Sequence, residues 1–315
     1  MTARELPARI LRSVRFRAKE WVWSEWDVLS ARAMAPFRKP PHPGARRAKV
    51  FCQVKNEEDI IGDWVDYHAW VFGEENLFVI DDGSSDRTSS ILRSRLPERQ
   101  LIVLPLRQNA NWEELKMENL NALLERERSG CDFLIPLDAD EFVICGAHPD
   151  RDAIHSELSR LAGTDGEVFK FHLDFNAVTL GDHPHPVREI VSFERHKRAS
   201  NMKKSFFRAG TFRWVGLGQH YGYSASVRRP YVSMLGLMHY EWRGVRQALA
   251  KCLKVAAGTP RPGESGPRGA RHYWDGLQAH AEGRFTEWLA SRIRTSDFRT
   301  SEMADLMCRL AGGEK

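Results

Sequence analysis

Three carboxylates close an apolar segment of the chain and suggest a metal site. Asp138, Asp140 and Glu141 follow the run FLIPL at 133–137, which has the composition of a buried β-strand. Side chains two residues apart in an extended segment point to the same face, so Asp138 and Asp140 could hold one hard cation such as Mg²⁺ or Mn²⁺. Unpaired charges beside a core are costly, so positive charge is expected there. The pattern predicts a divalent cation that binds the phosphates of a substrate.

Two other predicted strands also end in polar clusters. VKNEED at 54–59 contains Asn56 and Glu57, and VIDDGSSD at 79–86 contains Asp81 and Asp82. A carboxylate at the end of a strand can accept hydrogen bonds from a ribose or a base. A structural interpretation stays open for Glu57, because acids in the first turn of a helix are favoured by the helix dipole.

The segments that carry these clusters alternate between strand and helix. Short apolar runs predict strands, and apolar residues at helical spacing predict the helices between them. The expected strands lie within 49–56, 75–86, 99–106 and 131–142, and the expected helices are 57–72, 86–96 and 111–130. This order predicts an α/β fold, in which helices flank a mainly parallel central sheet and ligands bind at the carboxyl ends of its strands.

The second half of the chain is less regular. It predicts a helix at 151–163, strands at 167–178, 189–198 and 231–242, a hairpin or loop at 205–224, and helices at 243–258 and within 271–311. Residues 258–269, GTPRPGESGPRG, are expected to form a loop.

Three motifs together resemble a known enzyme family. VKNEEDIIGDWVDYH, FVIDDGSSDRT and LIPLDADEF resemble the family 2-like glycosyltransferases of the GT-A fold, in particular a bacterial subgroup with a KNE…W…YH opening. The motifs cover roughly residues 48–145, and the weaker echoes FERHKR, KKSFFR and HYEWRG extend the resemblance to about residue 258. The resemblance implies a nucleotide-sugar-binding domain at 48–258, with a basic arm and linker at 1–47 and a loop and helical extension at 259–315.

The resemblance also implies roles for particular residues. The acids of the second strand hold the nucleoside in that family, which maps onto Asp81 and Asp82. The DxD motif holds Mn²⁺ or Mg²⁺ on the donor diphosphate, which maps onto Asp138 and Asp140. His239 in LMHYEW resembles the downstream histidine that often completes such a metal site.

The other site candidates carry weaker signals. His220 is a second choice for the metal-binding histidine, and lysine or arginine side chains could bind phosphates. The remaining donor-binding candidates are Asn56, Glu57, Lys204 and Arg208, and Lys203 and Lys251 could also meet phosphates. The catalytic base, which would take the proton of the acceptor hydroxyl, is Asp174 or Glu241, with Glu189 a further alternative. The ED pair found in many members of the family is absent, so the acceptor side departs from the family pattern.

Composition and charge restrict the class of protein. The chain has 315 residues, of which 42% are hydrophobic and 28% charged, as in ordinary globular proteins. Residues 1–49 contain 12 Lys and Arg against four Asp and Glu, so the net charge of this segment is +8. Because the whole chain has a net charge of +5, the remaining residues carry −3. The Arg- and Trp-rich segment 1–36 could contact an anionic membrane surface. We expect a cytoplasmic protein, peripheral at the inner membrane face, that binds no nucleic acid.

Other classes of protein remain as alternatives. A haloacid-dehalogenase-like phosphatase would carry its DxD after the first strand, and a nucleotidyltransferase would need a Gly-rich phosphate loop there. The main alternative is a non-catalytic scaffold of the same fold, or a membrane-tethered binding protein. The five cysteines are scattered without a CxxC pair, which predicts reduced thiols.

Overall fold

The computed structural model describes most of the chain from residue 47 onwards. The described residues are 47–105, 112–195, 203–226, 229–258, 271–293 and 296–313. The basic arm, its predicted membrane contact through 1–36 and most of the loop predicted at 258–269 lie outside them.

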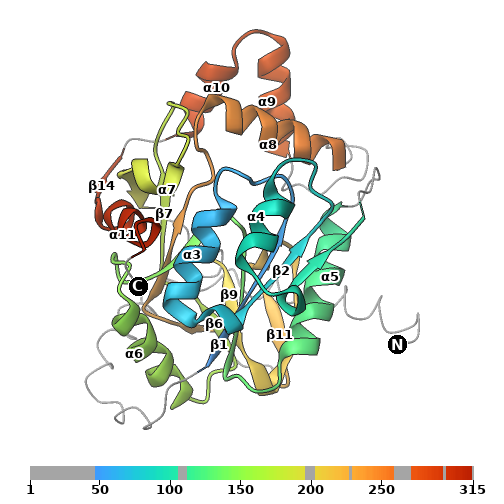
Figure 1. Cartoon of the computed structure of the whole chain (residues 1–315), viewed down its shortest axis with the longest axis vertical. Coiled ribbons are helices and arrows are strands. Elements are labelled where there is room, and N and C mark those ends of the chain that lie inside the picture. Colours follow the sequence, from blue (N-terminus) through green and yellow to red (C-terminus); the bar gives the residue numbers. More distant parts are fainter. Residues whose placement is uncertain are drawn as a thin grey trace.

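A seven-stranded, mostly parallel sheet forms the centre of the molecule (Figure 1). Its strands are β1 (Ala48–Val54), β2 (Leu77–Asp81), β3 (Leu101–Val103), β4 (Phe133–Leu137), β6 (Val168–Lys170), β9 (Ser205–Arg208) and β12 (Tyr231–Val232). They lie in the order β12-β6-β9-β4-β1-β2-β3. Only β9 runs antiparallel to its neighbours, β4 and β6. The predicted α/β class and the parallel arrangement of the first four strands are therefore confirmed.

Helices cover both faces of this sheet, with α3 (Ile61–Phe72) and α4 (Thr88–Arg95) on one and α5 (Trp112–Glu127) on the other. The remaining described helices are α6 (Arg151–Ala162), α7 (Pro186–Glu189), α8 (Val245–Gly258), α9 (Arg271–Ala281), α10 (Phe285–Arg292) and α11 (Glu302–Ala311). Short 3₁₀ turns occur at Glu74–Asn76, Glu98–Gln100, Ala209–Thr211 and Leu217–Gln219. The three helices predicted between the first four strands are α3, α4 and α5, as expected.

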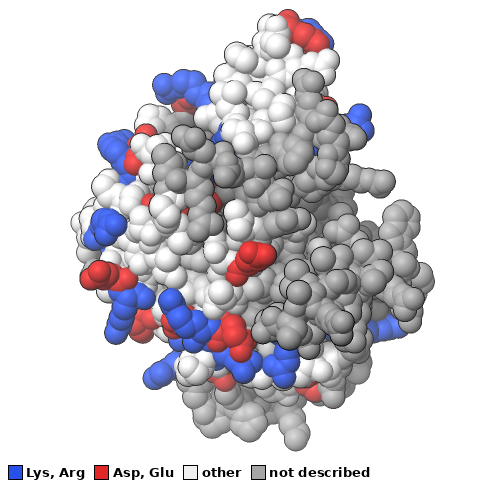
Figure 2. Space-filling view, turned by 90° about the vertical axis from the view of Figure 1, so that its right-hand side faces the viewer, with Lys and Arg blue, Asp and Glu red and all other residues white. Residues whose placement is uncertain are grey.

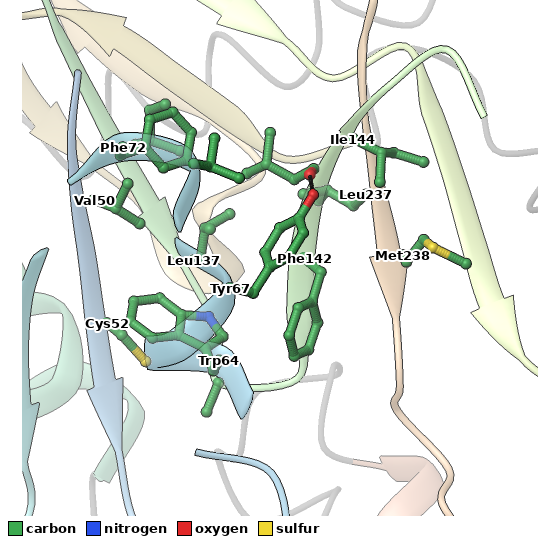
Figure 3. Close-up of a cluster of buried hydrophobic side chains, with 14 of the residues drawn as sticks. Val50, Cys52, Trp64, Tyr67, Phe72, Leu137, Phe142, Ile144, Leu237 and Met238 are labelled. Carbon is green, nitrogen blue, oxygen red and sulfur yellow. Dashed lines mark hydrogen bonds between the residues drawn. The ribbon is translucent and has the colours of Figure 1, made fainter. Parts of the chain in front are cut away.

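Alternation along β1 and β2 explains why both faces need helices. Val50 and Cys52 pack in the cluster that contains α3 and α4, whereas Phe51 packs in the cluster that contains α5. Successive side chains of a strand point to opposite faces, so an apolar run of this kind demands a cover on each side. On the α3 side, the hydroxyl of buried Tyr67 donates to the carbonyl of Val143 at 2.5 Å (Figure 3).

A second sheet of five strands adjoins the first. Its strands are β5 (Glu141–Cys145), β7 (Leu173–Ala177), β8 (Ser192–Arg195), β13 (Leu235–His239) and β14 (Phe298–Arg299), in the order β14-β8-β7-β13-β5. The segment 167–178, expected as one strand, is two strands in different sheets, because the chain leaves the first sheet after β6 and enters the second at β7. The hairpin expected within 205–224 is β10 (Phe212–Val215) with β11 (Gly222–Ser224), and β9 precedes it.

The helical C-terminal region contributes to two separate clusters. α8, α9 and α10 pack together around Trp242, Phe285 and Leu289, at the top of Figure 1. α11 instead packs into the main core through Met303 and Met307. The domain boundary at 258–259 stays a prediction, and the structure shows that α11 and β14 belong to the body of the fold.

The surface charges, the lengths of the helices and the cysteines relate to the predictions made from composition. In Figure 2, basic and acidic side chains are interspersed on the described part of the visible face. No helix within the described ranges combines the length and the apolar character needed to cross a membrane. The five cysteines are all free thiols, as predicted: Cys52, Cys131, Cys145, Cys252 and Cys308.

Candidate donor site

Asp138 lies just after β4 and contacts two lysines. Its Oδ1 accepts a hydrogen bond from Lys116 Nζ on α5 at 2.6 Å, and its Oδ2 accepts one from Lys204 Nζ. Lys204 directly precedes β9, whose antiparallel direction places its first residues beside the carboxyl end of β4. The positive charge expected beside these carboxylates is therefore supplied by lysines.

Asp140 is bound by a second set of cations. Its Oδ2 lies 2.8 Å from Lys251 Nζ on α8 and 3.9 Å from a guanidinium nitrogen of Arg243. Its Oδ1 lies 3.5 Å from His239 Nε2 at the end of β13. The predicted association of Asp140 with His239 is thus present in the geometry.

Glu141 connects the motif to the second sheet. It opens β5, and its Oε2 accepts a hydrogen bond from the backbone N–H of Asp138 at 2.9 Å and lies 2.8 Å from Lys204 Nζ. In the ladder, Glu141 pairs with His239 of β13. The third carboxylate therefore orients the loop that carries Asp138.

The lysines hold both aspartates in the ionised form. Burial raises the pKa of Asp138, but Lys116 and Lys204 outweigh it, so this pKa lies well below its usual range. Burial acts in the same direction on Asp140, where Lys251 and then His239 outweigh it and again hold the pKa well below its usual range.

Glu141 and His239 are shifted the other way. Burial raises the pKa of Glu141 to about 7, although Lys204 opposes the shift. Burial lowers the pKa of His239, but Asp140 outweighs it and raises that pKa to about 9. His239 is therefore protonated at neutral pH in the absence of a cation, and a cation that bound it would release this proton.

Glu57 belongs to a buried ion-pair network. Its Oε2 lies 2.6 Å from Arg243 and its Oε1 2.5 Å from Lys254 Nζ on α8. Arg243 also contacts Asp59 at 2.8 Å and is 1% exposed. This network, which we call the Arg243 network (Glu57, Asp59, Arg243 and Lys254), ties the loop after β1 to α8 and to the loop before it. The predicted donor-binding role of Glu57 stays a prediction, beside this structural role.

The loop after β2 presents Asp81 and Asp82 at the same edge of the sheet. Asp81 Oδ1 accepts a hydrogen bond from the backbone N–H of Ser84 at 3.0 Å, which forms the turn at Gly83. The other carboxylate oxygen, Oδ2, is buried and has no hydrogen-bond partner among the residues that the structure describes. A buried unpaired oxygen of this kind is available to a hydroxyl or N–H group of a ligand.

Asn56 fixes the neighbouring loop after β1. Its φ is +52°, a conformation that asparagine adopts more readily than most residues. Its backbone N–H donates to Ser84 Oγ at 2.9 Å, and its Oδ1 accepts from the backbone N–H of Ser85 at 2.8 Å. Asn56 thereby joins the two polar loops, and its predicted contact with a donor stays untested.

The other predicted site residues lie at varied distances from this cluster. Arg208 pairs with Phe133 at the start of β4, the end opposite Asp138, and donates to the carbonyls of Gly166 and Thr164. This placement gives no support to its predicted donor-binding role. His220 lies in the loop between β10 and β11.

The two base candidates lie closer. Glu241 follows His239 by two residues; its carbonyl accepts from Lys251 at 3.3 Å, and its carboxylate lies 4.0 Å from His272 Nε2 on α9. Asp174 lies on β7, whose neighbour β13 ends in His239. Neither base assignment is tested by this geometry.

Sequence reasoning did not single out Lys116, Arg243 or Lys254. A signal for Lys116 was present, since it precedes Leu120 and Leu124 by four and eight residues and so lies on the buried stripe of α5. A lysine at an apolar position of a helix implies a buried anionic partner. Arg243 lacked such a signal, because it lies in a loop.

The residues present fit a divalent cation in part. No three or more His, Cys, Asp or Glu side chains in the described part of the chain converge as a complete metal site. Asp140 and His239 offer an oxygen and a nitrogen 3.5 Å apart, which suits two ligands of one Mg²⁺ or Mn²⁺. Mg²⁺ sites commonly use one or two protein ligands and complete their shell with substrate phosphates and water. Both oxygens of Asp138 face lysines, so its role as a ligand stays a prediction.

Comparisons with known proteins give only distant structural likenesses. No protein-family model and no curated protein matches the sequence. S. aureus TarS (residues 1–349) is 12% identical, with coverage of 85% of this chain and 88% of that chain and a TM-score of 0.37. Glucosyl-3-phosphoglycerate synthase from Mycobacterium tuberculosis, solved with Mn²⁺, uridine diphosphate and glucosyl-3-phosphoglycerate, is 15% identical, covers 88% and 86%, and has a TM-score of 0.33. At these identities and TM-scores, the likeness assigns no function to this chain.

Proposed function

We propose that the protein is a metal-dependent glycosyltransferase that moves a sugar from a nucleotide-sugar donor to a glycan or glycolipid acceptor with inversion. The observation that carries the proposal is the pair Asp138 and Asp140 at the carboxyl end of β4, with three lysines and His239 around it. Carboxylates for a cation and ammonium groups for phosphates are the two components that a nucleoside diphosphate requires. UDP is the first nucleotide to test.

The lysines have a role in binding the donor. Lys116 and Lys204 direct their ammonium groups at Asp138, and Lys251 directs its ammonium group at Asp140. An entering diphosphate would share these groups through charge-assisted hydrogen bonds. Asp81, with its unpaired buried oxygen, and Asp82 would bind the nucleoside at the carboxyl end of β2, which β1 separates from β4.

The chemical step needs a base and a stabilised leaving group. Asp140 and His239 would hold Mg²⁺ or Mn²⁺, with Asp138 beside them, and the cation would neutralise charge on the departing diphosphate. The acceptor oxygen forms a bond to the anomeric carbon as the bond to the diphosphate breaks. The hydroxyl proton passes to a carboxylate, for which Asp174 and Glu241 are the candidates.

Calorimetric titration tests the donor site. UDP, GDP and CMP would be added to the protein with and without Mn²⁺, and the double variant Asp138→Asn/Asp140→Asn would be compared with Asp305→Asn, a matched change on the exposed surface of α11. We expect metal-dependent binding of one nucleotide that the double variant loses and Asp305→Asn keeps. A folded wild-type protein that binds none of the three would refute the proposal and favour the non-catalytic scaffold.

The membrane association is a separate proposal. The Arg- and Trp-rich segment 1–36 would bring the enzyme to the cytoplasmic face of the membrane, where a lipid-linked acceptor would lie. Sedimentation with vesicles that contain anionic lipid tests this, with neutral vesicles as the control. If a protein without residues 1–47 binds anionic vesicles as well as the full chain does, the membrane role is wrong.

A further inference from the structure

Two polar side chains on β7 have hydrogen-bonding capacity that the described part of the protein does not use. Oδ1 of Asp174 and Oδ1 of Asn176 are both buried, and neither has a hydrogen-bond partner among the described residues. Nearly all buried polar atoms in folded proteins are paired, so two unpaired oxygens on one strand call for a specific explanation.

The sheet register places these side chains beside the candidate donor site. Asn176 pairs with His239 of β13, and His239 pairs with Glu141 of β5. Paired residues of neighbouring strands present their side chains on the same face, about 4.8 Å apart. Glu141, His239, Asn176 and Glu194 of β8 therefore form one row across the sheet, and Asp174 lies two residues before Asn176 on the same face.

The core does not require polar residues at these positions. Leu173, Phe175 and Ala177 on the other face of β7 are buried in the main hydrophobic cluster, whereas Asp174 and Asn176 are partly exposed. Their side chains make no hydrogen bond that would fix a turn, cap a helix or join two strands within the described chain. Burial lowers the pKa of the Lys203 ammonium, and Asp174 interacts electrostatically with this group and opposes the shift. Packing and backbone satisfaction nevertheless leave Oδ1 of Asp174 and Oδ1 of Asn176 without a structural role.

We propose that Asp174 and Asn176 form the acceptor subsite and bind hydroxyl groups of a neutral sugar or polyol. The inference rests on the proposed function and names the acceptor class for the same site. A hydroxyl donates to a carboxylate, and it both donates to and accepts from an amide, so the two side chains match neighbouring hydroxyls of a polyol. The negative charge of Asp174 is offset by the nearby Lys203 ammonium, so this position offers a phosphate or carboxylate group no net attraction.

Asn176 lies beside His239, which would place an acceptor next to the donor site. An acceptor held by Asn176 would present a hydroxyl one strand away from the residue that would hold the cation of the donor. Asp174, on the same face, would receive the proton of an acceptor hydroxyl. The alternative base, Glu241, lies beyond the end of β13 and is not part of the row.

Thermal unfolding separates a binding role from a structural one. Asn121 is a matched control, since it is also partly buried but its amide donates to Met117 and Val215 carbonyls and accepts from the Val215 N–H. Asn176→Leu should leave the midpoint temperature unchanged or raise it by a few degrees, because it removes an unpaired buried oxygen. Asn121→Leu should lower it. A fall for Asn176→Leu equal to that for Asn121→Leu would overturn the inference.

Acceptor kinetics provide the second test. Release of the nucleotide from sugar donors that carry the nucleotide identified by calorimetry would be measured with glycerol, ribitol and methyl β-glucoside as probe acceptors. Asn176→Leu should raise the KM for the accelerating probe about tenfold, the equivalent of one lost hydrogen bond of about 1.4 kcal/mol, with a smaller effect on kcat.

The outcomes separate the inference from the proposed function. Wild-type protein that binds no nucleotide overturns both. Wild-type protein that binds a nucleotide but is accelerated by none of the three probes overturns the polyol assignment alone. Acceleration with an unchanged KM in Asn176→Leu overturns the subsite.

Discussion

Replacing Arg243 with methionine should destabilise the protein by about 3 kcal/mol. The guanidinium is 1% exposed and contacts Glu57 at 2.6 Å, Asp59 at 2.8 Å and the carbonyl of Tyr240 at 3.0 Å. Removal of one partner from a buried ion pair costs roughly 3–5 kcal/mol, because the other charge stays buried. The lower end applies, since Glu57 keeps Lys254 at 2.5 Å and water can reach Asp59, whose side chain is 31% exposed.

Urea unfolding of matched variants measures this cost. Arg246→Met removes an arginine three residues later that is 88% exposed and pairs with Asp182 at 3.3 Å, so it should cost less than about 1 kcal/mol. Glu57→Gln combined with Arg243→Met should cost less than the two single changes added together, because the charge left unpaired is also removed. Equal costs for Arg243→Met and Arg246→Met would show that the network contributes nothing through burial, and the reasoning would be refuted.

Three further changes test the core and the backbone. Burial lowers the pKa of His68 to about 3, below the unfolded value near 6.5, so the unfolded state binds the extra proton and stability falls by about 2 kcal/mol between pH 6.5 and 5. His68→Leu should flatten this dependence in urea midpoints, and an unchanged slope would contradict the assignment. Tyr67→Phe leaves the Val143 carbonyl without its donor and should cost about 1–2 kcal/mol by the same assay; no loss would show that this bond adds nothing. Gly244→Ala, at φ +120° with the new Cβ 2.6 Å from a facing backbone oxygen, should lower the midpoint more than Gly283→Ala, at φ +70° with open space; the reverse order would exclude steric strain as the cause.

The alternation of strand and helix in the first half of the chain was predictable from local pattern. Each strand there is a short apolar run, each helix has an apolar stripe, and acids follow the carboxyl ends of β1, β2 and β4. The second half was harder to predict, because the chain moves between two sheets at β6 and β7 and β9 enters the first sheet antiparallel. The sheet that a strand joins, and its direction there, depend on contacts between strands that are distant in sequence.

In the candidate donor site, too, local motifs were predictable and contacts between distant residues were not. Asp138, Asp140 and His239 were identified from sequence, and the structure brings Asp140 and His239 within 3.5 Å. Lys204 and Lys251 were also candidates from sequence, but Lys116 and the pairing of these lysines with the two aspartates were not predicted, because a lysine does not reveal which distant carboxylate it will meet. The structure places Arg208 at the wrong end of β4 to join them, since β9 carries Lys204 and Arg208 to opposite ends.

The long separations within the charge cluster have a consequence for synthesis of the chain. Lys204 follows Asp138 by 66 residues in the sequence, Lys251 follows Asp140 by 111 residues, and Arg243 follows Glu57 by 186 residues. At ribosomal rates of about 5–20 residues per second, the last pair is complete only about 10–40 seconds after the first partner is made. Most elementary folding events are far faster than this. The nascent first half therefore holds Glu57 and Asp140 before these distant partners exist, whereas Asp138 can already pair with Lys116. The loop after β1 should remain open to solvent until α8 has emerged.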